Sequence, residues 1–113
     1  MGQRLVRVNA LLHREISSIL RSRYTVEAVA ITITGVDVAP DLRQSYVYYS
    51  VLGDEQQKEK AKRFFQKNAK EIRYQLGRTV TLKYLPFLKF VADKAVERGN
   101  TVSSLLDELN KDS

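Results

Sequence analysis

The sequence of 113 residues predicts an α+β fold, and three observations predict it. One segment near the N-terminus and one in the middle repeat apolar residues every three or four positions, as on one face of a helix. Between them, and again after the second, shorter segments alternate apolar and polar residues, as strands do. The predicted order is helix, strand, strand, long helix, strand, short helix, which places helices on one face of a small sheet. A chain of this length forms one core, so we expect a single domain over residues 1–113.

The first helix is predicted from about Arg4 to Arg21. The face expected to be buried is apolar and comprises Leu5, Val8, Leu12, Ile16, Ile19 and Leu20. The opposite face carries four guanidinium groups, those of Arg4, Arg7, Arg14 and Arg21. His13 lies at the flank, where we expect an ordinary surface or boundary role.

The segment from about Ala28 to Leu52 is predicted to form a β-hairpin. Its alternation changes phase at Gly35, which indicates a β-bulge. Pro40 and Asp41 supply turn chemistry between the strands. One face of the second strand is expected to hold Val47, Tyr49 and Val51, and the other to hold Tyr46, Tyr48 and Ser50.

The long helix is predicted from about Glu55 to Leu76, with Asp54 as its N-cap. Gly77 follows the predicted helix directly, and the residue just after a helix C-terminus is often glycine. Asn68 interrupts the apolar stripe, so we expect a kink at 68–70.

The last strand is predicted from Thr79 to about Ala92. Pro86 lies within it, which indicates an edge position or a bulge because proline cannot donate to a sheet. A short helix is expected at about 102–109, and the tail 110–113 is expected to fray.

The positive charge is concentrated in two segments. The chain carries a formal net charge of +6, whereas residues 1–23 alone carry +4 and residues 58–89 carry +8. Such an asymmetric distribution favours a polyanionic partner that meets particular faces of the protein.

Nucleic acid is the partner that these residue types suit best, because guanidinium and ammonium groups along a helix can contact successive phosphates. The candidate contacts on the long helix and just after it are Arg63, Lys67, Lys70, Arg73 and Arg78. Tyr46, Tyr48 and Tyr74 are candidates for stacking on unpaired bases. The alternative for each tyrosine is that it only covers the sheet or helix on which it lies.

Catalysis is not indicated by any motif. The chain has no cysteine and one histidine, and its five glycines are far apart, so no phosphate-binding loop is formed. No metal-binding or nucleophile motif is present. Asp37, Asp41 and Asp93 fit turn, edge and capping positions. We therefore predict a non-enzymatic protein without metal or cofactor, and no apolar run is long enough to span a membrane.

The order of elements matches that of a type II KH domain, which begins with a helix and two strands. That fold clamps nucleotides with a GxxG loop between its later helices, and this chain contains no GxxG. RNA contact would then depend on charged side chains. An RRM is disfavoured because the strand 45–50 lacks the glycine of its aromatic motif.

Four stretches in this order resemble the ribosome-binding factor A family, and together they span nearly the whole chain. They are Arg4-Leu5-Val6-Arg7-Val8-Asn9 leading to Glu15-Ile16, Ile33-Thr34-Gly35-Val36-Asp37-Val38-Ala39-Pro40-Asp41-Leu42, Val47-Tyr48-Tyr49-Ser50-Val51-Leu52-Gly53, and Leu85-Pro86-Phe87-Leu88-Lys89-Phe90-Val91-Ala92-Asp93. The resemblance implies a type II KH-like fold in which an interrupted helix replaces the GxxG loop. Family members usually have Ala-x-Gly at the interruption, where this chain has Asn68-Ala69-Lys70.

The resemblance also implies a function. A family member binds the free 30S subunit, assists late maturation of 16S rRNA, including processing of its 5′ end, and is linked to growth in the cold. It is a cytoplasmic protein that performs no chemistry and works beside other assembly factors, and we expect a monomer. Two alternatives remain: a basic protein–protein docking module, and a hydrolase that uses Asp37, Asp41 or Asp93.

Overall fold

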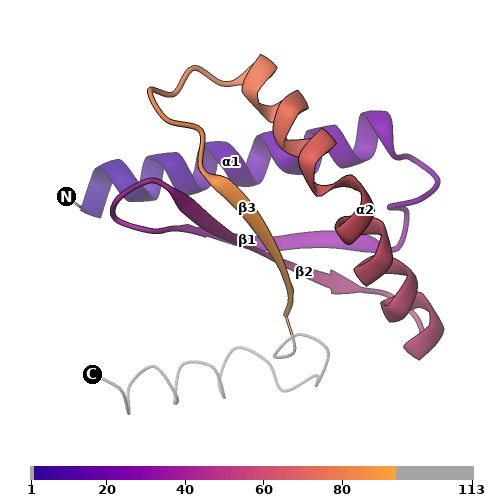
Figure 1. Ribbon diagram of the computed structural model, residues 1–113. Helices are drawn as coiled ribbons and strands as arrows, with labels where there is room; N and C mark the ends of the chain where they lie inside the picture. Colours follow the sequence, from indigo (N-terminus) through magenta and orange to yellow (C-terminus); the bar gives the residue numbers. More distant parts are fainter. Residues whose placement is uncertain (1, 94–113) are drawn as a thin grey trace, which may run out of the picture.

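The computed structural model describes residues 2–93, with side chains from residue 4 onward. Its elements are α1 (Gly2–Arg23), β1 (Ile31–Val38), β2 (Gln44–Val51), α2 (Glu55–Thr79) and β3 (Phe87–Ala92). The sheet has the order β1-β2-β3, with β2 antiparallel to β1 and parallel to β3. Figure 1 shows α1 and α2 on the same side of this sheet. The predicted helix at 102–109 and the tail 110–113 lie outside the described residues.

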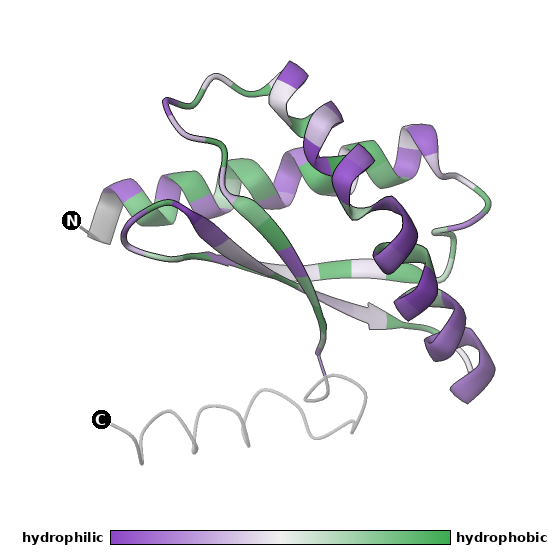
Figure 2. Ribbon diagram, viewed as in Figure 1, coloured by the Kyte–Doolittle hydropathy of each residue, from purple (hydrophilic) through white to green (hydrophobic). Residues whose placement is uncertain are grey.

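The core fills the space between the two helices and one face of the sheet. Leu12 and Ile16 from α1, Ile72 and Leu76 from α2 and Val47 from β2 are all fully buried. The predicted alternation on β2 is confirmed, since Val47, Tyr49 and Val51 are buried whereas Tyr46 is exposed. Figure 2 shows hydrophobic residues recurring along α1 and the strands, and a largely hydrophilic N-terminal half of α2.

The predicted β-bulge is confirmed. Ile33 pairs with Tyr49 and Gly35 pairs with Tyr48, which leaves Thr34 as the extra residue of β1. The hydroxyl of Thr34 donates to Asp93 Oδ2 at 2.8 Å, so the bulge directs this side chain across the sheet.

Two polar side chains of α1 lie along the outer edge of β1. Asn9 Oδ1 accepts a hydrogen bond from the backbone N–H of Val38 at 2.8 Å. One helical turn later, His13 Nε2 donates to the carbonyl oxygen of Ile33 at 2.9 Å. The boundary role expected for His13 is therefore a specific one, because the ring satisfies a backbone group at an unpaired sheet edge.

The long helix begins as predicted but is not interrupted where an interruption was expected. The predicted cap is confirmed, because Asp54 accepts from the backbone N–H of Gln57. However, α2 continues without a break to Thr79, so the interrupted helix that the resemblance implied at 68–70 is wrong. Asn68 is accommodated because its side-chain amide donates back to the carbonyl oxygen of Phe64 at 2.9 Å, within the helix.

Gly77 lies inside α2 rather than after it, so its predicted role as the residue that ends the helix is also wrong. A Cβ at this position would lie 3.1 Å from Leu85 Cδ2. The absence of a side chain therefore lets the segment after the helix pack closely against its last turns.

The last strand is shorter than predicted, and the expectation that it begins at Thr79 is wrong. Thr79 is the final residue of α2, and β3 begins at Phe87, immediately after the buried Pro86. The edge position indicated by Pro86 is confirmed, since β3 pairs only with β2 in the described sheet. Because β2 and β3 are parallel, the apolar residues after Thr79 serve the connection that crosses between them rather than a strand.

Candidate nucleic-acid interface

The four arginines predicted on α1 all lie on its exposed side. Arg4, Arg7, Arg14 and Arg21 are exposed because the opposite side of the helix supplies buried core residues. Arg14 Nε lies 3.2 Å from Glu15 Oε2, but the Arg14 side chain is still 72% exposed. An exposed pair of this kind contributes little stability, so the guanidinium can exchange partners easily.

The predicted basic face of α2 is also exposed. Arg63, Lys67 and Lys70 lie at the surface, where Arg63 Nε is 3.5 Å from Glu59 Oε1. Further along the helix, Tyr74 is exposed and the Arg78 guanidinium lies 5.9 Å from its ring centroid. The structure therefore assembles these five side chains on the solvent side of one continuous helix.

Arg73 is placed differently from the other candidates. Its Nη2 donates to the carbonyl oxygen of Leu85 at 2.7 Å, and its Nε donates to that of Pro86 at 3.0 Å. The guanidinium also lies 4.2 Å from the ring centroid of Phe87. This half-buried arginine thus ties α2 to the segment that leads into β3.

Two tyrosines of β2, Tyr46 and Tyr48, lie on the sheet face away from the helices, whereas Tyr49 is buried against α2. Tyr46 is exposed, and Lys89 Nζ lies 6.0 Å from its ring centroid. Tyr48 is half-buried, and burial followed by the charge of Asp37 raises the pKa of its hydroxyl. This face therefore offers aromatic surface beside carboxylates.

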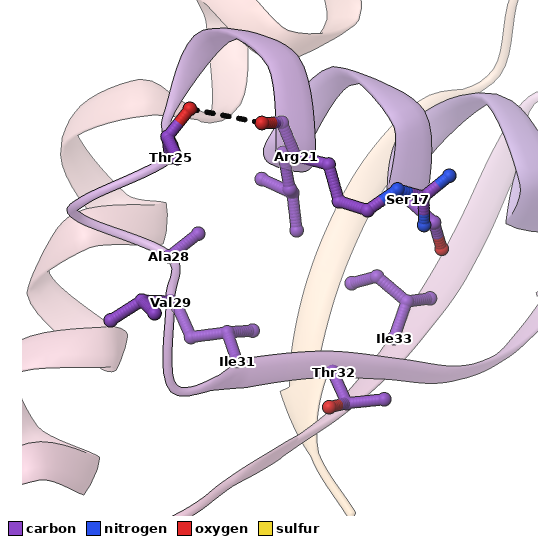
Figure 3. A pocket seen from close by; sticks show the side chains of 9 residues that line it. Ser17, Arg21, Thr25, Ala28, Val29, Ile31, Thr32 and Ile33 are labelled. Atoms are coloured by element: carbon purple, nitrogen blue, oxygen red, sulfur yellow. Dashed lines mark hydrogen bonds between the residues drawn. The ribbon is translucent and has the colours of Figure 1, made fainter.

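A hollow of about 500 Å³ adjoins Arg21 between the C-terminal end of α1 and β1. Figure 3 shows Ser17, Arg21 and Thr25 on one side of it and Ile31 on the other. The hydroxyl of Thr25 donates to the carbonyl oxygen of Arg21 at 3.0 Å, which fixes the end of the helix.

Sequence reasoning missed two exposed residues between α2 and β3. Lys83 and Tyr84 line a small hollow together with Arg4, so the fold brings them beside the first turns of α1. Their segment was predicted to be a strand, which hid them from consideration. The signal that could have found them is a basic-aromatic pair directly before Leu85-Pro86, where a strand is difficult to continue.

A metal-binding cluster is not found in the part of the chain that the structure describes. Within residues 2–93, no cluster of three or more histidine, cysteine, aspartate or glutamate side chains could hold a metal ion. Among the described helices, none is both long enough and apolar enough to cross a bilayer.

The fold is thus an α+β, KH-like domain with the element order α-β-β-α-β. It is similar to the crystal structure of ribosome-binding factor A from Thermus thermophilus, with a TM-score of 0.69 and 22% identity over 78% of this chain and 94% of that one. A second match is a homology model of the Thermus thermophilus factor fitted into a cryo-electron-microscopy map of a 30S complex. It has a TM-score of 0.63 and 24% identity, over 76% of this chain and 91% of that one.

Sequence comparison defines the family. The family model "Ribosome-binding factor A" matches residues 4–106. The ribosome-binding factor A of Opitutus terrae is 43% identical over 111 residues, which cover 98% of this chain and 91% of that protein. That of Pediococcus pentosaceus is 38% identical, over 94% of this chain and 93% of the relative. The chain belongs to the ribosome-binding factor A family, as the sequence resemblance implied.

Proposed function

We propose that this protein binds the free 30S ribosomal subunit through RNA and assists the late maturation of 16S rRNA, including the processing of its 5′ end. The observation that carries the proposal is the pair of exposed cationic helix faces in a member of this family. The 30S complex of the Thermus thermophilus factor supports the choice of particle. Maturation and 5′-end processing follow only from the family resemblance.

The candidate RNA contacts are the exposed cations of both helices: Arg4, Arg7, Arg14 and Arg21 on α1, and Arg63, Lys67, Lys70 and Arg78 on α2. Phosphate contacts of this kind need no rearrangement of the fold, because the groups project from packed helices. Tyr46, Tyr48 and Tyr74 remain candidates for base stacking.

The mode of action is non-catalytic. The protein would act by occupying and shaping rRNA while other assembly factors carry out the chemistry around it. It would act in the cytoplasm as a monomer, with a role in growth at low temperature.

The test is charge reversal on α2. A variant with Arg63→Glu, Lys67→Glu and Lys70→Glu should fold normally, because these side chains lie outside the core. It should lose most co-sedimentation with purified 30S subunits at low salt. Log affinity falls as log salt rises, and each lost phosphate contact should make this fall less steep by about 0.7 to 0.9. The three residues together should reduce the steepness by about 2 to 3.

The matched control reverses three exposed cations elsewhere, Arg43, Lys62 and Lys89, and so changes the net charge by the same amount. Binding that falls equally in both variants would mean that net charge, and not the helix face, governs association. Binding by the wild-type protein that survives complete ribonuclease digestion would instead favour the alternative of a basic protein–protein docking module.

A further inference from the structure

The connection between α2 and β3 presents a cation and an aromatic ring beside the start of α1. Tyr84 is 60% exposed, and Lys83 Nζ lies 5.6 Å from its ring centroid. Arg4 lines the same hollow of about 50 Å³, whose walls also include Leu82 and Pro86. An exposed aromatic ring with two cations around it thus lies at the junction of segments far apart in the sequence.

This connection is held in place from several directions. Arg73 donates to the two successive carbonyl oxygens of Leu85 and Pro86. Pro86 is buried, and Leu85 packs against the position of Gly77. A ring on a segment fixed in this way is ready for contact before a ligand arrives, which lowers the entropic cost of binding.

We propose that Tyr84, Lys83 and Arg4 form a binding site for one unpaired nucleotide of RNA. The base stacks on the exposed surface of the Tyr84 ring, and the neighbouring phosphates lie against Lys83 and Arg4. The inference deepens the proposed function, because it takes RNA as the ligand and names the element of RNA that this corner of the molecule recognises.

The shape and charge of the site favour a nucleotide over an enclosed small molecule. The hollow is too small to contain a base, so a ligand must lie on the surface against the ring. No acidic side chain lines the hollow among the described residues, so nothing there repels phosphate. Stacking on one aromatic residue accounts for about a 5- to 150-fold change in affinity per base in single-strand binding.

The experiment measures fluorescence anisotropy with an eight-nucleotide single-stranded RNA and with the same strand carrying abasic sites. Tyr84→Ala should weaken binding of the intact strand by at least about fivefold and should leave binding of the abasic strand unchanged. Tyr84→Phe should bind both strands as the wild type does, because stacking needs the ring and not the hydroxyl. A merely structural role of Tyr84 would reduce the binding of both strands equally and would overturn the proposal.

Matched variants check the loop and the cations. Thr81→Ala, an exposed non-aromatic change in the same connection, should leave affinity unchanged. Lys83→Ala should weaken binding of both RNA strands. Lys62→Ala, which removes an equal charge elsewhere, should weaken binding of neither strand. A wild-type protein that binds the strand through Tyr84 but ignores 30S subunits would refute the proposed function alone. A Tyr84→Ala variant that binds the intact strand normally would refute this site alone.

Discussion

Replacing Arg73 with lysine tests whether this arginine stabilises the fold or contacts RNA. The substitution keeps the positive charge but loses the guanidinium group that donates to two carbonyl oxygens at once. The guanidinium makes two hydrogen bonds to carbonyl oxygens, at 2.7 and 3.0 Å, and lies 4.2 Å from the Phe87 ring centroid. A hydrogen bond to a charged group contributes about 1.5 to 3 kcal/mol, and we take the lower end because Arg73 is only half-buried. The cation–π contact adds about 0.5 to 1 kcal/mol.

A lysine can replace at most one of these hydrogen bonds. Arg73→Lys should therefore lower the free energy of unfolding by about 2 kcal/mol, and Arg73→Met should lower it by about 3 to 4 kcal/mol. Urea titration followed by circular dichroism measures this, with an expected shift in midpoint of about 1 to 2 M for Arg73→Lys. Arg63→Lys is the control, since its exposed pair with Glu59 contributes at most about 0.5 kcal/mol.

The reasoning would be refuted by an Arg73→Lys protein that unfolds at the wild-type urea concentration. If both Arg73 variants kept wild-type stability and yet bound RNA more weakly, Arg73 would be an RNA contact, and its hydrogen bonds to the connection would contribute nothing to folding.

Three further perturbations test other parts of the fold. Burial raises the pKa of Tyr48 above 10.0, so the stability that its neutral hydroxyl supports is intact below about pH 10 and is lost as the pH rises through the raised value. Tyr48→Phe should accordingly lose less stability than the wild type between about pH 9 and 11, and parallel curves in urea titrations would contradict this. Gly53→Ala should destabilise by about 1 to 3 kcal/mol in thermal melts, because φ is +132° and a Cβ would lie 2.7 Å from Gln57 Cγ. Asn9→Ala should cost about 1 to 2 kcal/mol by leaving a β1 backbone N–H without its acceptor, and unchanged hydrogen exchange at that amide would contradict it.

The sequence predicted the elements whose periodicity is strong and failed where tertiary packing decides the outcome. The amphipathic stripe of α1 and the bulge at Gly35 follow from local pattern, and both are confirmed. Gly77 was predicted to end a helix because glycine commonly does so, but here it serves a close contact with Leu85. That contact joins residues on different elements, so no local pattern could reveal it.

In the candidate site, too, local pattern predicts some residues and tertiary packing decides the others. Exposure of the α1 arginines follows directly from the buried stripe opposite them. In the sequence, Arg73 was a candidate RNA contact like Lys70. Helical spacing indicates which side of the helix a residue occupies, but it does not show that backbone carbonyl oxygens of another segment lie within reach of Arg73. Tyr84 was overlooked because the sequence does not show that the connection between α2 and β3 packs beside Arg4, and it is this packing that makes Tyr84 a candidate.

The distribution of exposed charge also bears on which side of the molecule would face phosphates in the proposed RNA complex. On the sheet face away from the helices, burial first and then the charge of Asp37 raise the pKa of Tyr48, and Asp93 acts in the same direction. A phosphate placed beside Tyr48 would be repelled by these two carboxylates, whereas Lys89 lies near Tyr46 on the same face. On the helix side, exposed cations project from α1 and α2 together, and Figure 1 shows both helices on one side of the sheet. Both basic faces therefore belong to the helix layer, which is the arrangement that contact with one folded RNA would require. This arrangement favours docking through the helices, and it makes Tyr74 on α2 a stronger stacking candidate than Tyr46 and Tyr48 on the opposite sheet face.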